Sequence, residues 1–116
     1  MIARSDLAVG TALEPQEYGP LTLTDFVRYQ GASGDFNPIH HDTAFAKAAG
    51  FPEPFSVGML QAGILGSYAT DRFGAANVRR FAVSFREQVW AGDVLVCSGE
   101  VVAIDRKSTR LNSSHT

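Results

Sequence analysis

Apolar and polar residues alternate over residues 78–90, and this is the clearest strand pattern in the chain. One face of this strand would carry Phe81, Val83 and Phe85, and the other Arg80, Ser84 and Arg86. Strict alternation is typical of a half-buried β-strand. A turn-forming Ala-Gly-Asp follows at 91–93, and residues 94–104 suit a second strand. The pattern therefore predicts a long antiparallel hairpin.

A different pattern precedes the hairpin, because apolar residues between positions 57 and 73 follow no single face. They are Val57, Met59, Leu60, Ala62, Ile64, Leu65, Tyr68 and Ala69. A helix that is apolar all round is buried, and Gly58, Gly63 and Gly66 make this one thin. We predict a long central helix against which one face of the hairpin packs. It is too short and too interrupted to span a membrane.

Two short helices are predicted ahead of the central one. Thr24 suits the N-cap of the first, over residues 26–30, which the glycines at 31 and 34 would end. Asp42 suits the N-cap of the second, over residues 43–49. The polar loop between these helices would then begin just after a helix terminus.

The two ends of the chain look less regular. Residues 7–22 contain scattered apolar positions interrupted by Pro15 and Pro20, which indicates an extended segment at the edge of a sheet. Residues 106–116 are small and polar with one aliphatic side chain, so we expect a non-native or disordered tail. Residues 1–105 would then form a single domain that is truncated at its C-terminal end.

Size and charge narrow the class of protein. A chain of 116 residues with 45% hydrophobic residues suits one domain, and a formal charge of -2 without a basic run argues against nucleic acid as a partner. We interpret Arg79, Arg80 and Arg86 as the solvated face of a strand; the alternative is contact with the phosphates of a coenzyme or carrier arm.

The cysteine count and the N-terminal residues bear on the compartment. Cys97 is the single cysteine, so no intramolecular disulfide is possible and a reducing compartment fits. The first residues lack the apolar region of a signal peptide, and no apolar run reaches membrane-spanning length. We expect a soluble cytoplasmic protein with no membrane partner.

The polar side chains that could take part in catalysis are concentrated in residues 33–42. Asp35, Asn37 and His40 lie around Pro38, so a bend could bring carboxylate and imidazole to face each other for acid–base chemistry. The alternative is structural, since Asp and Asn in such loops commonly bond their own backbone. His41 beside them fits a structural or outward-facing role. His40, His41 and Asp42 could suggest a metal site, but no further set of ligands with recognisable spacing occurs elsewhere in the sequence.

A family resemblance rests on this loop. Residues 29–40 read Tyr-Gln-Gly-Ala-Ser-Gly-Asp-Phe-Asn-Pro-Ile-His, and Asp42, Ala46 and the Gly58-Met59-Leu60 run follow. Over roughly residues 20–104 the chain resembles MaoC-like dehydratases and (R)-specific enoyl-CoA hydratases. The resemblance implies an α+β hotdog fold, an antiparallel sheet wrapped around a long central helix, here lacking its last strand or strands. It also implies a homodimer, or a heterodimer with another hotdog subunit.

The resemblance also implies an activity and roles for particular residues. Such enzymes add water to trans-2-enoyl thioesters to give (R)-3-hydroxyacyl thioesters, or catalyse the reverse. The substrate is carried on CoA or acyl carrier protein, and no further cofactor is implied. The catalytic pair falls on Asp35 and His40, with Asn37 in support. The backbone N–H that stabilises the oxyanion falls on or beside Gly58, in a substrate-binding run that contains Ser56 and Val57.

Two departures from the family pattern keep other functions open. Relatives often have histidine where this chain has Val57, and they continue past residue 104 into at least one further strand. One alternative is therefore a non-catalytic hotdog subunit that binds acyl thioesters or supports a catalytic partner. Another is a hotdog thioesterase, which would release free thiol.

Overall fold

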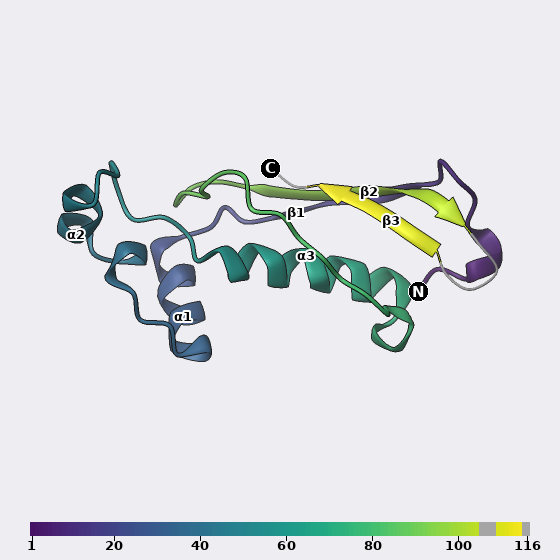
Figure 1. The fold of residues 1–116 in the computed structure, drawn as a ribbon, viewed down its shortest axis with the longest axis horizontal. Coiled ribbons are helices and arrows are strands. Elements are labelled where there is room, and N and C mark those ends of the chain that lie inside the picture. The colour runs from purple at the N-terminus through teal and green to yellow at the C-terminus, as the bar shows by residue number, and fades with distance from the viewer. Residues whose placement is uncertain (105–108, 115–116) are drawn as a thin grey trace. The chain divides into compact units, whose positions relative to one another are not determined.

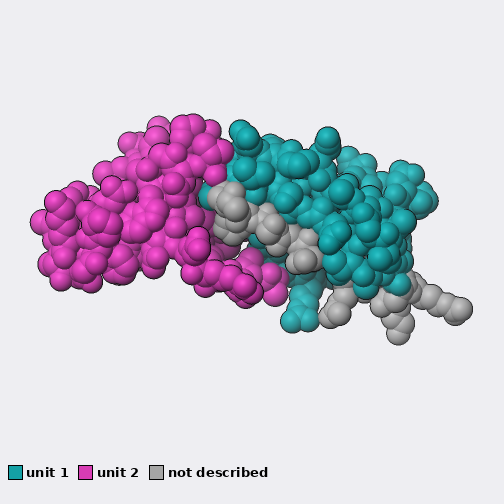
Figure 2. All heavy atoms as spheres, turned by 90° about the horizontal axis from the view of Figure 1, so that it is seen from above, with its two compact units in different colours: residues 1–18, 65–81, 95–116 teal, residues 19–64, 82–94 magenta. Residues whose placement is uncertain are grey.

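The computed structural model describes residues 1–104 and 109–114 (Figure 1). The chain forms two compact units, coloured separately in Figure 2. Unit 1 comprises Met1–Tyr18, Leu65–Phe81 and Leu95–Thr116, and unit 2 comprises Gly19–Ile64 and Ala82–Val94. Each unit thus combines segments that are far apart in the sequence.

Unit 1 contains a three-stranded antiparallel sheet in the order β1-β2-β3 (Figure 1). The strands are β1 (Ala12–Tyr18), β2 (Leu95–Ile104) and β3 (Thr109–Ser114). The register of β1 against β2 shifts between Leu13 and Gln16, which is where Pro15 lies. Proline is tolerated at a bulge of an edge strand because it has no N–H to donate. The prediction of an extended edge segment within residues 7–22 is confirmed.

The predicted hairpin is wrong. Residues 78–90 form no regular strand, although β2 falls within the predicted second strand. β2 pairs with β1 along one edge and with β3 along the other, so neither of its edges is left for residues 78–90. The alternation of side chains predicted a strand, but alternation does not say which segment pairs with which.

The C-terminal segment also differs from the expectation of a loose polar tail. Within it, β3 pairs with β2 from Ser98↔Ser114 to Ile104↔Thr109. Backbone N–H and C=O groups make this ladder, so a polar sequence can form it, and polar composition is common in strands at an edge. Residues 106–108 and 115–116 of the expected tail lie outside the described residues.

The central helix, α3 (Gly58–Phe73), has the predicted extent. Its burial is one-sided, so the prediction that it is buried all round is wrong. Ala62, Leu65 and Tyr68 are buried, whereas the side chain of Met59 is 57% exposed. Gly63 and Ser67, four and eight residues after Met59, are exposed as well. None of the helices in the described part of the chain is long and apolar enough to cross a membrane.

Polar side chains join α3 to β1 within unit 1. The Tyr68 hydroxyl donates to the Glu14 carbonyl oxygen at 2.6 Å. The Arg72 guanidinium lies 3.5 Å from the centre of the Tyr68 ring and donates to Gln16 Oε1 at 2.9 Å. Cys97 in β2 is buried, and burial raises the pKa of its thiol. We interpret these contacts as structural, because they hold α3 against β1.

Unit 2 contains the two short helices, α1 (Leu23–Ser33) and α2 (Thr43–Ala48). Asp42 caps α2 as predicted, accepting a hydrogen bond from Phe45 N–H at 3.1 Å. The predicted cap of α1 was two residues too late, because Thr22 and Asp25 form a reciprocal capping box. A single turn of 3-10 helix, η2 (Pro38–His40), also lies in unit 2, and two others, η1 (Arg4–Asp6) and η3 (Ala75–Asn77), lie in unit 1.

Candidate functional site

The polar loop of unit 2 begins where α1 ends. Gly34 has a φ of 77°, a left-handed conformation that favours glycine, and its N–H donates to the Gln30 carbonyl oxygen at 2.9 Å. Gly31, which was predicted to help end the helix, lies inside it. The left-handed residue turns the chain sharply, and Asp35 follows directly.

Two side chains then fold the loop upon itself. Asp35 Oδ1 accepts from the Asn37 N–H at 3.3 Å, and Asn37 Oδ1 accepts from the Ile39 N–H at 3.1 Å. Asn37 is therefore the N-cap of η2, whose first residue is Pro38. Both bonds are side-chain-to-backbone turns of the kind that Asp and Asn favour. The Asp35 carboxylate belongs to an exposed residue and retains acceptor capacity beyond this bond.

His40 is the buried member of the predicted pair, with 9% of its surface exposed. Its Nδ1 lies 2.8 Å from the Phe55 carbonyl oxygen, and the two rings meet edge to face with centres 5.3 Å apart. A carbonyl oxygen can only accept, so Nδ1 carries the proton. In the neutral ring Nε2 therefore holds a lone pair, and this nitrogen is the one available for chemistry.

The segment that fixes His40 leads directly into α3. Phe55 packs against Phe51 and Trp90, at 4.8 Å and 5.9 Å between ring centres. The next residue, Ser56, donates its N–H to the Val89 carbonyl oxygen at 2.7 Å. These contacts hold the backbone rigidly on both sides of the carbonyl that His40 bonds.

The first turn of α3 provides backbone donors. The first N–H groups of an α-helix have no partner within the helix and suit a developing negative charge. Gly58 is the first residue, and a Cβ there would lie 3.3 Å from the Phe85 ring. The buried Ser56 hydroxyl donates to Gln61 Oε1 at 2.6 Å, which stiffens this turn. Val57 between them is also buried.

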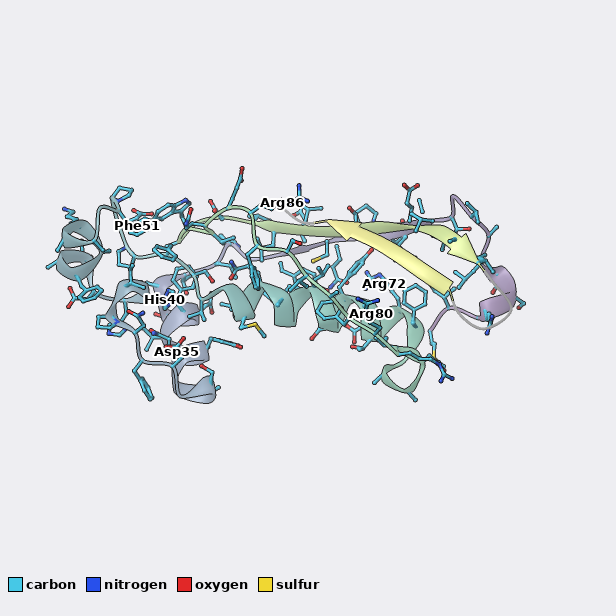
Figure 3. The ribbon with its side chains drawn as sticks, in the orientation of Figure 1. Asp35, His40, Phe51, Arg72, Arg80 and Arg86 are labelled. Atoms are coloured by element: carbon cyan, nitrogen blue, oxygen red, sulfur yellow. The ribbon has the colours of Figure 1, made fainter. Side chains whose placement is uncertain are left out.

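Asp35, Asn37 and His40 thus lie on one loop, on which Figure 3 labels Asp35 and His40. His40 is bonded to Phe55, the residue that precedes the Ser56–Gly58 run. Sequence reasoning missed two buried glutamines, Gln30 and Gln61, whose only signal was a polar residue within a helical pattern.

Other candidates lie outside this arrangement. The arginines at 79, 80 and 86 are exposed on an extended segment without regular pairing. His41 is exposed, and its Nδ1 lies 2.8 Å from Gln30 Oε1. Among the described residues no group of three His, Cys, Asp or Glu is arranged to hold a metal ion.

Comparison with known protein families gives a match over nearly the whole chain. The family described as "MaoC like domain" matches residues 5–115. The chain belongs to this family. Its curated relatives include the (R)-specific enoyl-CoA hydratase of Aeromonas caviae, 35% identical over 80 residues, which cover 66% of this chain and 58% of the relative. A mitochondrial 3-hydroxyacyl-[acyl-carrier-protein] dehydratase of Arabidopsis thaliana is 31% identical over 104 residues, covering 90% of this chain and 60% of the relative.

Solved structures show that this MaoC-like domain has a hotdog fold, as predicted. The A. caviae (R)-hydratase superposes with a TM-score of 0.82 and 26% identity over 97% of this chain and 86% of that one. A chain of the ChsH1-ChsH2 complex of Mycobacterium tuberculosis gives a TM-score of 0.83 and 25% identity, over 93% and 85%. Several relatives are much longer: the match spans 7% of a Neurospora crassa hydratase-dehydrogenase-epimerase and 23% of the M. tuberculosis dehydratase Y.

Proposed function

We propose that this MaoC-like domain catalyses the hydration of trans-2-enoyl thioesters to (R)-3-hydroxyacyl thioesters, or the reverse dehydration, on CoA or acyl carrier protein. Curated relatives of the family that carry the names of enoyl-CoA hydratases and 3-hydroxyacyl dehydratases support this reaction class. Asp35 and His40 form the acid–base pair in the proposal, and Asn37 supports them.

The observation that carries the proposal is the bond from His40 Nδ1–H to the Phe55 carbonyl oxygen. It leaves His40 Nε2 free to accept a hydrogen bond from water. It also fixes the imidazole to the backbone three residues before Gly58, where α3 begins. A base, an acceptor for water and a set of helix N–H donors are the parts that this addition requires.

In the hydration direction, the water oxygen bonds to C3 of the substrate while Asp35 takes one of its protons. The electron pair of the C2=C3 double bond moves toward the thioester oxygen, and the resulting enolate is stabilised by the backbone N–H at or beside Gly58. His40 Nε2 holds the water in place. The proton taken up by the pair is returned to C2, so that one water is added in total.

Loss of enoyl absorbance with crotonyl-CoA and longer enoyl-CoAs tests this proposal. Asp35→Asn and His40→Ala are each expected to lower kcat about 100-fold or more, the usual contribution of a positioned acid or base. Glu53→Gln is the matched control, because Glu53 is an exposed carboxylate of the same unit that keeps its size in the amide. A wild type without hydratase activity, or pair variants as active as the control, would refute the assignment.

A second candidate is a non-catalytic hotdog subunit that binds acyl thioesters or supports a catalytic partner subunit, and residues 79–88 favour such pairing with another subunit. These residues are exposed, and none of the backbone hydrogen bonds among the described residues involves them. Phe81, Val83 and Phe85 are 46%, 38% and 54% exposed. An extended segment with unpaired backbone and apolar side chains favours the addition of a strand.

A second copy of this chain is the partner that the side chains favour. In a two-fold antiparallel pairing centred on Val83, Phe81 lies opposite Phe85 of the other copy, and Arg79 lies opposite Glu87. Aromatic and opposite-charge pairs stabilise such ladders, while Arg80 opposite Arg86 is the one unfavourable pair. The related ChsH1-ChsH2 complex makes a different hotdog chain the alternative partner. Full activity only after mixing with such a chain would favour the non-catalytic role.

The free thiol of Cys97 fits a reducing compartment. We therefore propose a cytoplasmic location.

A further inference from the structure

Gln30 is the polar side chain whose burial calls for an explanation. It lies in the last turns of α1 and is 1% exposed. Its Nε2 donates to the Asn37 carbonyl oxygen at 2.9 Å, and its Oε1 lies 2.8 Å from His41 Nδ1. One buried amide thus contacts both ends of the Asn37–His41 stretch that contains the proposed catalytic imidazole.

The chemistry of the partners fixes which way this amide faces. The Asn37 carbonyl oxygen can only accept a hydrogen bond, so the NH2 group of Gln30 must face it. Gln30 Oε1 then faces His41, and because an amide oxygen also only accepts, His41 Nδ1 must carry a proton. The backbone carbonyl of Asn37 therefore determines the tautomer of a histidine four residues later.

The same logic applies to the neighbouring His40, whose Nδ1–H donates to Phe55. Two adjacent imidazoles are consequently held as Nδ1–H tautomers by acceptors on different elements. His40 is anchored to the connector that precedes α3, and His41 is anchored to α1. With both rings anchored, η2 between Asn37 and His41 cannot rotate without breaking a hydrogen bond.

Asn37 extends this anchoring to the carboxylate. Its N–H donates to Asp35 Oδ1, and its carbonyl oxygen accepts from both Gln30 Nε2 and the His40 N–H, the latter at 3.3 Å. A change at Gln30 therefore acts on Asp35 and His40 through one shared residue, Asn37. We propose that Gln30 is a positioning residue that sets the geometry of the Asp35–His40 pair through Asn37 and His41. This inference rests on the proposed hydratase function.

Three variants separate the two bonds of Gln30. Gln30→Met keeps the length of the side chain and removes both bonds. Gln30→Glu keeps an acceptor for His41 but cannot donate to Asn37, and His41→Ala removes only the bond to the imidazole. Arg28→Met is the control, because Arg28 is an exposed residue of the same helix.

The first measurement is steady-state hydration of crotonyl-CoA. We expect Gln30→Met and Gln30→Glu to lower kcat about tenfold or more, because small displacements of catalytic groups cost that much, with KM changed less than about threefold. His41→Ala is expected to lower kcat by a smaller factor than the Gln30 variants, because it leaves the bond from Gln30 to Asn37 intact, and the control is expected to match wild type. A wild-type kcat in both Gln30 variants would overturn the proposal.

The second measurement does not depend on activity. Long-range 1H–15N correlation spectra of the histidine rings at pH 8, well above the range in which imidazoles ordinarily titrate, report each tautomer. We expect an Nδ1–H tautomer for His41 in wild type and Gln30→Glu, and mainly Nε2–H in Gln30→Met, while His40 stays Nδ1–H. A His41 tautomer that is unchanged in Gln30→Met would refute the proposed positioning role of Gln30. An inactive wild type with the expected tautomers would refute only the hydratase function.

Discussion

The loop of residues 34–41 and the segment of residues 79–88 are both irregular, yet their hydrogen bonding is opposite. In the loop, short polar side chains bond to backbone groups a few residues away, as Asp35 and Asn37 do. In the segment, the described residues offer no backbone partner, and alternate side chains are apolar and exposed.

The difference shows what each sequence can achieve within one chain. Asp and Asn carry acceptors close to the backbone, so they can satisfy a tight loop without help from a distant element. Phe and Val carry none, so the N–H and C=O groups of an extended segment that contains them are left to water or to another strand. The turns of the loop are thus formed by its own side chains, whereas residues 79–88 have no backbone partner among the described residues.

Removing one polar side chain from each region should have the most different effects on stability and activity. Asn37→Ala deletes the cap of η2 and is expected to cost about 1 kcal/mol in the free energy of unfolding. It should also lower kcat about tenfold or more, because η2, the turn that carries His40, loses the side-chain acceptor of the Ile39 N–H. Ser84→Ala, in the segment, should change stability by less than about 0.5 kcal/mol. Urea unfolding and crotonyl-CoA hydration measure both effects, and equal losses in the two variants would contradict the contrast.

The proposed pairing of the segment with a second copy can be tested next. Val83→Lys places a charge in the middle of the exposed edge, a substitution that discourages strand pairing. We expect the dissociation constant of the dimer to rise about tenfold or more, because one such charge typically costs over 1 kcal/mol at a buried pair. Sedimentation equilibrium measures this change, with Ala44→Lys on the exposed surface of α2 as the control. If wild type is monomeric, or if both variants associate like wild type, pairing through this segment is wrong.

Two glycines of α3 give a smaller and sharper effect. A Cβ at Gly63 would meet nothing within 4 Å, so Gly63→Ala should raise stability by about 0.5–1 kcal/mol through helix propensity. A Cβ at Gly58 would lie 3.3 Å from the Phe85 ring, so Gly58→Ala should gain less. The double variant Gly58→Ala, Phe85→Ala should show no further penalty from the alanine at 58 relative to Phe85→Ala alone. Thermal unfolding decides this point, and the same gain at both glycines would show that Phe85 does not pack there.

Much of the fold could be predicted because its signals are local. The extent of α3 follows from a long apolar run, and the cap at Asp42 follows from one residue type at one position. The cap of α1 was predicted at Thr24, although the spacing of Thr22 and Asp25 is that of a capping box and indicates Thr22. Strand pairing was missed because alternation defines the faces of a strand and not its neighbours.

The sequence by itself placed the candidate residues Asp35, Asn37 and His40 within a few positions of one another, next to a glycine and around a proline. Only the tertiary structure decided their states. The proton on His40 Nδ1 depends on Phe55, fifteen residues away, and the burial of Gln30 depends on where Asn37 and His41 come to rest. A hydrogen bond fixes a tautomer through the partner it finds, and that partner is supplied by the folded chain rather than by neighbours in sequence.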